Sequence, residues 1–408
     1  MDMAKPIIRF KGYQDDWEQR KSGEIAPLRG GFAFKSNEYS PDGVPIVRIS
    51  NILSDGSVGS DFAYYGEQNS DDMYALYDGA VVLAMSGATT GKISVLHTKK
   101  GQKYYQNQRV GYFTPTDSCD YGFIKTIMRS QLFAEQLSSV LVAGAQPNVS
   151  SREIDGFEFM IPKSKDEQQK IGVYFSKLDH LITLHQRKCD ETKRLKKYML
   201  QKMFPQNGEK VPEIRFSGFT DDWEQRKLSE IALQTYGGGT PKTANEEFWK
   251  GNIPWIQSSD LIEERLFNVK PRKYISQEAI SKSATKLVPQ NSVAMVTRVG
   301  VGKLAFMPFS YATSQDFLSL SELKIEPEFV VYALYKMMRL VSNEVQGTSI
   351  KGITKDELLA KEILIPDCEE QKKIGAYLHN LDHLITLHQR ELENLQNIKR
   401  FMLGKMFV

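Results

Sequence analysis

The chain carries a long internal repeat, and this repeat restricts its possible folds more than any other feature. The decapeptide LDHLITLHQR occurs at residues 178–187 and again, unchanged, at 381–390. A second repeated block contains DDWEQRK, at residues 15–21 and 221–227. Self-similarity at a fixed offset indicates repeated structural units, so we interpret the chain as two tandem halves.

The full repeats extend well beyond these short identities. EQQKIGVYFSKLDHLITLHQRKCDETKRLKKYMLQKMF corresponds to EQKKIGAYLHNLDHLITLHQRELENLQNIKRFMLGKMF, and IRFKGYQDDWEQRKSGEIA corresponds to IRFSGFTDDWEQRKLSEIA. Between these blocks the two halves barely match. The predicted segments are a shared block (1–26), a divergent domain (27–162), a helix (163–205), a linker with the second shared block (206–232), a second divergent domain (233–366) and a second helix (367–408).

Both long repeats have the apolar pattern of a coiled-coil helix. Apolar residues recur in steps of four and three, and a sustained 3.5-residue period is typical of a seam between helices. A helix of about 38 residues is roughly 57 Å long, which is enough to hold two domains apart. The predicted seam residues are Ile171, Phe175, Leu178, Ile182 and His185 in the first copy and Ile374, Leu378, Leu381, Ile385 and His388 in the second.

Polar residues interrupt both seams at the same places, His185 with His388 and Lys196 with Lys399. An ordinary core helix is the alternative to a seam, but matching polar exceptions favour the seam. A polar residue in a seam usually fixes register or orientation. We interpret the histidines as such devices rather than as metal ligands.

A capping box is expected at the start of each helix. Ser164 is followed by Glu167, and Asp367 by Glu370, in each case just after a proline. The Ser or Asp oxygen is expected to accept a free backbone N–H, and the glutamate to return the bond.

The divergent regions have mixed α and β character, which predicts an α+β fold overall. The elements expected in the first region are strands at 44–50 and 80–86, a glycine-bounded turn at 87–92 and a helix around 123–137. Those expected in the second region are a strand at 253–259, a hairpin at 292–306 and a helix at 329–345. The two regions therefore share an outline but not a surface chemistry.

Catalytic motifs are missing from the sequence. GATTGK (87–92) resembles a phosphate-binding loop, but Ser86 and Ile93 stand where that motif needs Gly and Ser or Thr. We interpret it as a hairpin turn with one exposed lysine. The stretch from Asp367 to Glu370 superficially resembles a nuclease motif, but its spacing is too short and a helix cap explains it. GxSxG, HExxH and amino-methyltransferase motifs do not occur, which counts against a stand-alone enzyme.

The composition says more about the cellular compartment of the protein than about its binding partner. Three scattered cysteines, without a CxxC pair, argue against a disulfide framework or a zinc site. The chain lacks a signal peptide and any apolar run long enough to span a membrane, so a cytoplasmic protein is expected. A net charge of +3 is too small to identify a partner, and a DNA-binding protein would need to concentrate its basic residues locally.

Two divergent domains of about 130 residues, two near-identical helices ending in KMF and the repeated DDWEQRK together resemble the specificity subunit of a type I restriction–modification enzyme. The resemblance covers the whole chain. It implies that each divergent domain is a target-recognition domain that reads one half of a gapped DNA site. It also implies that the helices pair antiparallel, act as a spacer and form a platform for modification subunits.

In that family the specificity subunit catalyses nothing itself. The resemblance implies two modification subunits, which carry S-adenosylmethionine and methylate adenine, and restriction subunits, which use ATP and Mg to translocate and cleave DNA. No cofactor or metal is expected in this chain. The repeat agrees independently, because tandem halves form a pseudo-twofold molecule that matches two half-sites on duplex DNA. Unlike domains predict an asymmetric site.

The identical helix surfaces suggest two equivalent docking sites for two copies of one partner. Helix pairing alone would not require Thr183, Gln186 and Arg187 to be repeated as the same three residues 203 positions later.

DNA contacts are expected from polar residues on turns and loops at matching places in both domains, since Lys and Arg bind phosphates and Arg, Lys, Asn and Gln read bases. The candidates in the first domain are Lys92, Asn107, Gln108, Arg109, Gln146, Asn148 and Ser150. Those in the second domain are Arg298, Lys303, Ser314, Gln315, Thr348, Ser349, Lys351 and Thr354. Trp17 and Trp223 are expected to be core anchors rather than binding residues.

Two other functions remain open at this stage. One is a non-catalytic coiled-coil adaptor with two ligand-binding domains that are not directed at DNA, which the modest net charge favours. The other is an enzyme with an unrecognised site. Salt-dependent DNA binding would separate the first from a specificity subunit, and methyl transfer by the isolated chain would support the second.

Overall fold

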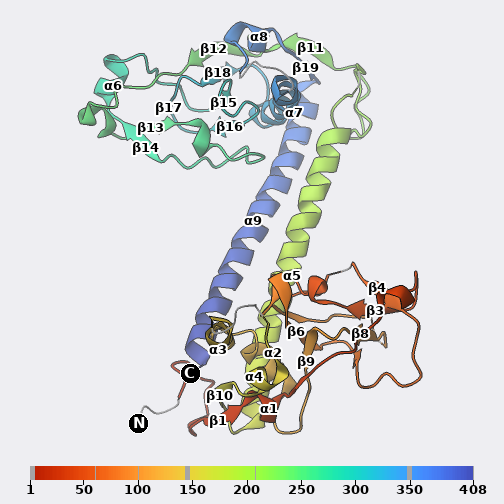
Figure 1. The fold of residues 1–408 in the computed structure, drawn as a ribbon. Coiled ribbons are helices and arrows are strands. Elements are labelled where there is room, and N and C mark those ends of the chain that lie inside the picture. Colours follow the sequence, from red (N-terminus) through yellow and green to blue (C-terminus); the bar gives the residue numbers. More distant parts are fainter. Residues whose placement is uncertain are drawn as a thin grey trace. The chain divides into compact units, whose positions relative to one another are not determined.

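The computed structural model describes residues 5–59, 61–99, 101–142, 148–206, 208–346 and 352–407, with the backbone alone at 142, 345 and 346. The chain divides into two compact units, and most of their helices and strands are labelled in Figure 1. Unit 1 consists of Met1–Gln186 with Arg390–Val408, and unit 2 of Arg187–Gln389. Each of the two long helices therefore contributes its opposite ends to different units.

In the described residues, unit 1 contains two four-stranded sheets, β2-β9-β6-β7 and β4-β3-β8-β5, and the strand pair β1-β10. The strands are β1 (Glu18–Lys21), β2 (Leu28–Arg29), β3 (Val44–Val47), β4 (Ala63–Tyr65), β5 (Ala75–Leu76), β6 (Val81–Ala84), β7 (Ile93–Val95), β8 (Tyr104–Gln106), β9 (Val110–Phe113) and β10 (Glu158–Ile161). The helices are α1 (Ser22–Ile25), α2 (Tyr121–Ile127), α3 (Gln131–Val142), α4 (Ser151–Asp155) and the first part of α5 (Lys165–Lys202), with short 3-10 turns η1 (Ser36–Glu38), η2 (Ile49–Asn51) and η3 (Gly87–Thr89).

Unit 2 repeats this plan in its described residues, with sheets β12-β18-β15-β16 and β14-β13-β17 and the pair β11-β19. The strands are β11 (Glu224–Lys227), β12 (Ala232–Gly237), β13 (Ile253–Ile256), β14 (Lys273–Ile275), β15 (Ser292–Val296), β16 (Leu304–Met307), β17 (Ala312–Thr313), β18 (Phe317–Leu323) and β19 (Glu362–Ile365). The helices are α6 (Gln277–Ser281), α7 (Pro327–Gln346), α8 (Lys355–Ala360) and the first part of α9 (Cys368–Met406), with turns η4 (Leu228–Glu230), η5 (Glu246–Trp249) and η6 (Ser258–Asp260).

The two units share strand pairings as well as element order, and the predicted α+β class is confirmed. The EQRK segments form the same antiparallel pair, with Glu18 opposite Ile161 and Glu224 opposite Ile365. Each unit also contains one parallel pair, β3 with β8 and β13 with β17. The four residues of β3, VPIV, are all buried, as expected for a strand covered on both faces.

The predicted helix around 123–137 is interrupted in the structure. It is two helices, α2 and α3, separated at residues 128–130. The Ser130 hydroxyl and backbone N–H both donate to the carbonyl of Ile127, at 2.6 and 3.0 Å. These local bonds compete with the helical pattern and close the first helix in a tight turn. The matching helix of unit 2, α7, runs unbroken for 20 residues.

The long helices have the predicted length, 38 residues in α5 and 39 in α9. Within unit 1, the first part of α5 packs against the last part of α9, and unit 2 contains the complementary ends. The seam positions Ile171, Phe175 and Leu178 are buried, but they pack against the first divergent domain as well as the partner helix. Ile374, Leu378, Leu381 and Ile385 are also buried, whereas Ile182, His185 and His388 are half-buried.

The KMF endings insert aromatic rings into the hydrophobic cores. In unit 1, the ring of Phe407 lies 6.2 Å from Trp17 and 5.7 Å from Phe123, measured between ring centroids. In unit 2, Phe204 lies 5.8 Å from Trp223 and 5.6 Å from Phe329. Trp17 and Trp223 are almost fully buried, which confirms that they are core anchors. The core of each unit is therefore completed by the end of the helix that begins in the other half of the sequence.

Candidate nucleic-acid interface

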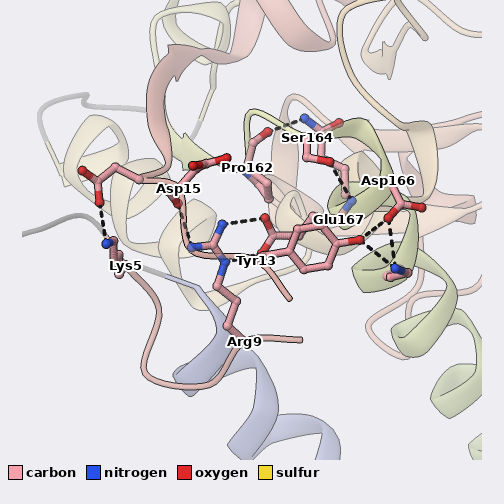
Figure 2. A network of polar contacts seen from close by, with 11 residues as sticks. Lys5, Arg9, Tyr13, Asp15, Pro162, Ser164, Asp166 and Glu167 are labelled. Atoms are coloured by element: carbon pink, nitrogen blue, oxygen red, sulfur yellow. Dashed lines mark hydrogen bonds and ion pairs between the residues drawn. The ribbon is translucent and has the colours of Figure 1, made fainter. Parts of the chain in front are cut away.

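The shared block fixes the start of each long helix through a buried ion pair. Arg9 donates two hydrogen bonds to the carboxylate of Glu167, at 2.6 and 2.8 Å, and the contact is drawn in Figure 2. Arg215 and Glu370 form the same bidentate pair at 2.7 and 2.8 Å. The hydrogen bonds with Glu167 raise the pKa of Arg9 above its ordinary value.

The predicted capping boxes are only half right, because the two glutamates form these ion pairs instead of binding the cap residues. The backbone N–H of Glu167 donates to Ser164 Oγ at 3.4 Å, and that of Glu370 donates to Asp367 Oδ1 at 3.1 Å, so the caps themselves form as expected. The glutamate side chains, however, bind arginines rather than the cap. A bidentate bond between two charged groups is stronger than a bond to one backbone N–H, so the tertiary partner prevails.

One detail of this contact differs between the halves. Tyr13 donates to Asp166 and accepts a bond from Lys170 Nζ at 2.7 Å (Figure 2). The corresponding residue in the second half is Phe219, and Lys373 Nζ lies 4.8 Å from the centroid of its ring. The contact between the shared block and the start of the long helix is thus retained in both halves, although its chemistry differs.

The lysines that interrupt the seams bind aspartates on the opposite helix. Lys196 Nζ lies 2.5 Å from Asp382 Oδ1 in unit 2, and Lys399 Nζ lies 2.5 Å from Asp179 Oδ1 in unit 1. Burial alone would raise the pKa of Asp179, yet Arg129 and Lys399 hold it below its ordinary value. Each pair requires one antiparallel register, because a shift of one turn would leave a buried charge alone.

Three loops form a common surface at the end of the parallel strands in unit 1. We call residues 48–51, 86–92 and 107–109 the three-loop surface of this unit. The backbone N–H of Asn107 donates to Val47 O at 3.1 Å, and that of Met85 donates to Arg109 O at 3.0 Å. Thr89 Oγ1 donates to Ile49 O at 3.1 Å, which brings the second loop against the first.

The three-loop surface of unit 2 consists of residues 257–260, 298–303 and 314–316, and its backbone is held in the same way. The N–H of Ser314 donates to Ile256 O at 3.0 Å, and the N–H of Thr297 donates to Asp316 O at 2.7 Å. Lys303 Nζ lies 3.4 Å from Ser258 O. Positions 107–109 and 314–316 are therefore structurally equivalent.

The structure brings many of the predicted DNA-binding candidates onto these two surfaces. Lys92, Asn107, Gln108 and Arg109 lie on the first, and the backbone of Asn148 pairs with Ser86 beside them. Arg298, Lys303, Ser314 and Gln315 lie on the second. Gln108, Arg109, Arg298 and Gln315 are exposed, whereas Lys92, Asn107 and Lys303 are half-buried and Ser314 is buried.

Two further candidates cap short helices. Ser150 Oγ accepts the N–H of Glu153 at the start of α4, and Thr354 Oγ1 accepts that of Glu357 at the start of α8, each at 3.3 Å. Both hydroxyls therefore have a local structural role. The remaining candidates, Gln146, Thr348, Ser349 and Lys351, lie outside the described residues.

Sequence reasoning missed three residues on or beside these surfaces. Arg48 and Gln257 each follow the first parallel strand directly, and Lys273 lies in β14 next to β13. The available signal was the matched motifs VPIVR and IPWIQ, in which the residue after the strand differs. A pocket of about 290 Å³ opens at this place in unit 2, lined by Gln257, Lys273, Ser314 and other residues.

Metal-binding clusters and membrane-spanning helices are both absent from the described part of the chain. Groups of three or more His, Cys, Asp or Glu side chains placed to hold a metal ion are not found among the described residues. Within the same residues, every helix is either too short or too polar to cross a bilayer.

Comparison with known proteins identifies the duplicated architecture. A family model described as the type I restriction modification DNA specificity domain matches the chain twice, at residues 14–194 and 220–397. The chain belongs to this family of specificity subunits. The two matches correspond to the two halves, and they cover most of the chain.

Individual relatives match one half or the whole. The specificity subunit of the type I restriction enzyme MjaIX from Methanocaldococcus jannaschii is 27% identical over 194 residues, which is 46% of this chain and 44% of that protein. The putative MjaX specificity subunit of the same organism is 21% identical over 95% of this chain and 91% of its own. The EcoR124I/EcoR124II specificity subunit of Escherichia coli is 31% identical over 40% of this chain and 41% of its own.

Solved structures share the fold. The crystal structure of a type I restriction–modification S subunit from M. genitalium matches with a TM-score of 0.69 at 13% identity and covers 99% of both chains. A chain from a structural study of complex assembly and conformational transition in the type I system matches with a TM-score of 0.51 at 19% identity, over 96% of this chain and 97% of that one. Family membership makes this chain the non-catalytic component that recognises the DNA target, and the cofactors of such systems belong to partner subunits.

Proposed function

We propose that the first recognition domain (27–162) and the second (233–366) each read one half of an asymmetric, gapped DNA site. The observation that carries this proposal is the pair of three-loop surfaces. Their backbones are held by equivalent hydrogen bonds, while the residues at equivalent positions differ. A retained frame with changed side chains is expected where two domains perform one task on different sequences.

The residues proposed to contact DNA are the candidates on these surfaces. Lys92 and Lys303 occupy the same place after their hairpin turns, which suits contact with phosphates that every target shares. Residues 107–109 and 314–315 differ between the domains and carry amide, guanidinium and hydroxyl groups, which suits base reading. Local concentration of such groups makes DNA binding compatible with a net charge of only +3.

We further propose that α5 and α9 space the half-sites and dock two modification subunits. The repeated surface contains Arg187 and Arg390, which are both exposed. Since the ion pairs between the helices already account for their register, identity of outward-facing residues supports a second contact, with a partner present in two copies. By family resemblance, these partners use S-adenosylmethionine to methylate adenine, and restriction subunits with ATP and Mg cleave DNA. Such a complex would act in the cytoplasm.

The decisive experiment is a methylome of cells that express the chain with its modification subunit. Long-read sequencing is expected to find a two-part, asymmetric motif with methylated adenine in each part. Replacement of residues 233–366 by the corresponding domain of another specificity subunit should change one part and leave the other intact. An assembled complex that methylates no such motif would refute the proposal and favour the adaptor function.

A further inference from the structure

The three-loop surfaces differ most sharply in charge, at two pairs of equivalent positions. Arg48 and Gln257 each follow the first parallel strand. Arg109 and Asp316 each end the loop after the second parallel strand, and their carbonyls accept equivalent backbone bonds. Unit 1 therefore presents two arginines where unit 2 presents an amide and a carboxylate.

Arg48 is held in place but keeps donors available. Its Nη2 donates to the carbonyl of Asp61 at 3.0 Å, which orients the guanidinium. Its Nε is buried and lacks a hydrogen-bond partner among the described residues. A buried donor without a partner carries an energetic penalty. Arg109 is exposed on the neighbouring loop.

The corresponding place in unit 2 is a polar pocket of about 290 Å³ with a rigid wall. Trp255 is buried, donates its indole N–H to Gly239 O at 3.0 Å and meets Trp249 edge to face at 4.9 Å between centroids. Lys273 Nζ lies 5.6 and 5.7 Å from the two ring centroids, at the edge of the same pocket. Lys273 thus supplies a positive charge to the pocket that Asp316 also lines.

Gln257, Gln315 and Asp316 also line this pocket. Ser314 Oγ donates to Asp316 Oδ2 at 3.4 Å, and Thr240 Oγ1 donates to Gln315 Oε1 at 3.0 Å. These bonds orient the side chains of Asp316 and Gln315 without using all of their hydrogen-bonding capacity. A carboxylate on a surface that meets phosphates is unfavourable unless it accepts a hydrogen bond from the DNA, because like charges repel.

We propose that these two positions set the base preference of each recognition domain, with Arg48 and Arg109 reading guanine and Gln257 and Asp316 reading bases that carry an exocyclic amino group. This inference rests on the proposed function and adds a chemical assignment to it. Arginine binds the O6 and N7 acceptors of guanine with two parallel hydrogen bonds. A carboxylate accepts from cytosine N4, and glutamine pairs with adenine N6 and N7.

The test replaces one residue at a time in the full chain, co-expressed with its modification subunit, and reads the methylome. Arg109→Gln is expected to move the preference from guanine to adenine at one position of one half-site. Asp316→Arg is expected to introduce guanine at one position of the other half-site and to lower methylation of the original motif by about 5- to 150-fold. Glu278→Arg, on the exposed face of α6, is the matched control with the same charge change and should leave the motif unchanged.

The outcomes separate the two levels of the proposal. A two-part motif for the wild type that stays unchanged in Arg109→Gln and Asp316→Arg overturns the base assignment but leaves the proposed function standing. Absence of a two-part motif in the wild type overturns both. If Asp316→Arg abolishes all methylation, Asp316→Asn tests the assignment instead, since it keeps the shape of the side chain and removes its negative charge. Relaxed selection at one base in that variant supports the assignment, and an unaltered motif contradicts it.

Discussion

The KMF ending of α5 should anchor unit 2, and this can be tested by replacing Phe204 with alanine. Phe204 is 4% exposed and packs against Trp223 and Phe329. Removal of about 160 Å² of buried ring surface at about 25 cal/mol per Å² costs about 4 kcal/mol, within the range of about 3–5 kcal/mol for such truncations. For a unit of about 200 residues, this lowers the melting temperature by about 8–16 °C.

Calorimetry of the full chain measures the loss, and hydrogen exchange locates it. Phe204→Ala should increase exchange in α7 of unit 2, whereas Phe407→Ala should increase it in α2 of unit 1, because each ring lies in a different core. Phe401→Ala on α9 is the matched control, since that side chain is 57% exposed. A loss for Phe204→Ala no larger than that of Phe401→Ala would refute the anchoring role.

Three further predictions concern the helices and their ends. Burial lowers the pKa of Lys336 to about 8, so the unfolded chain holds more protons than the folded one between about pH 8 and 10.5, and the stability of unit 2 should rise with pH in that window. Urea titrations at several pH values should show no such rise for Lys336→Met. The same pH dependence in that variant as in the wild type would show that Lys336 is not its cause. Lys196→Met leaves the carboxylate of Asp382 without its cation and should lower the free energy of unfolding by about 3 kcal/mol. The double variant with Asp382→Leu should recover part of this loss in the same unfolding assay. Strictly additive losses would argue against a coupled pair. Arg187→Glu combined with Arg390→Glu should abolish co-purification of the modification subunit with little change in melting temperature, and undiminished co-purification would exclude that docking face.

The helices were largely predictable because their pattern is local. A 3.5-residue period over nearly 40 residues leaves few alternatives, and both helices form with the expected length. The capping glutamates were less predictable. Their choice between a nearby backbone N–H and a distant arginine depends on where the shared block lies, 158 residues away in the case of Arg9. Sequence spacing carries no information about that distance.

The candidate interface was predictable in outline and incomplete in detail. Residues 107–109 and 314–315 were found because they occupy matching loops, yet Arg48 and Gln257 belong to the same surfaces and were missed. They lie at the end of an apolar strand motif, where a polar residue is expected simply because the strand ends there. Only the parallel pairing of β3 with β8, and of β13 with β17, brings these positions beside the loops.

The amino-acid sequence alone showed that the chain is duplicated, that its repeats are long helices and that its two divergent domains share one fold. Those conclusions follow from periodicity and identity, which the chain displays residue by residue. Which residues complete each core and each surface became clear only from the folded chain. Phe407 packs with Trp17, and Lys399 pairs with Asp179, although more than 200 residues separate the members of each pair. Such contacts depend on the antiparallel return of the second helix, because only folding brings the two ends of the chain together.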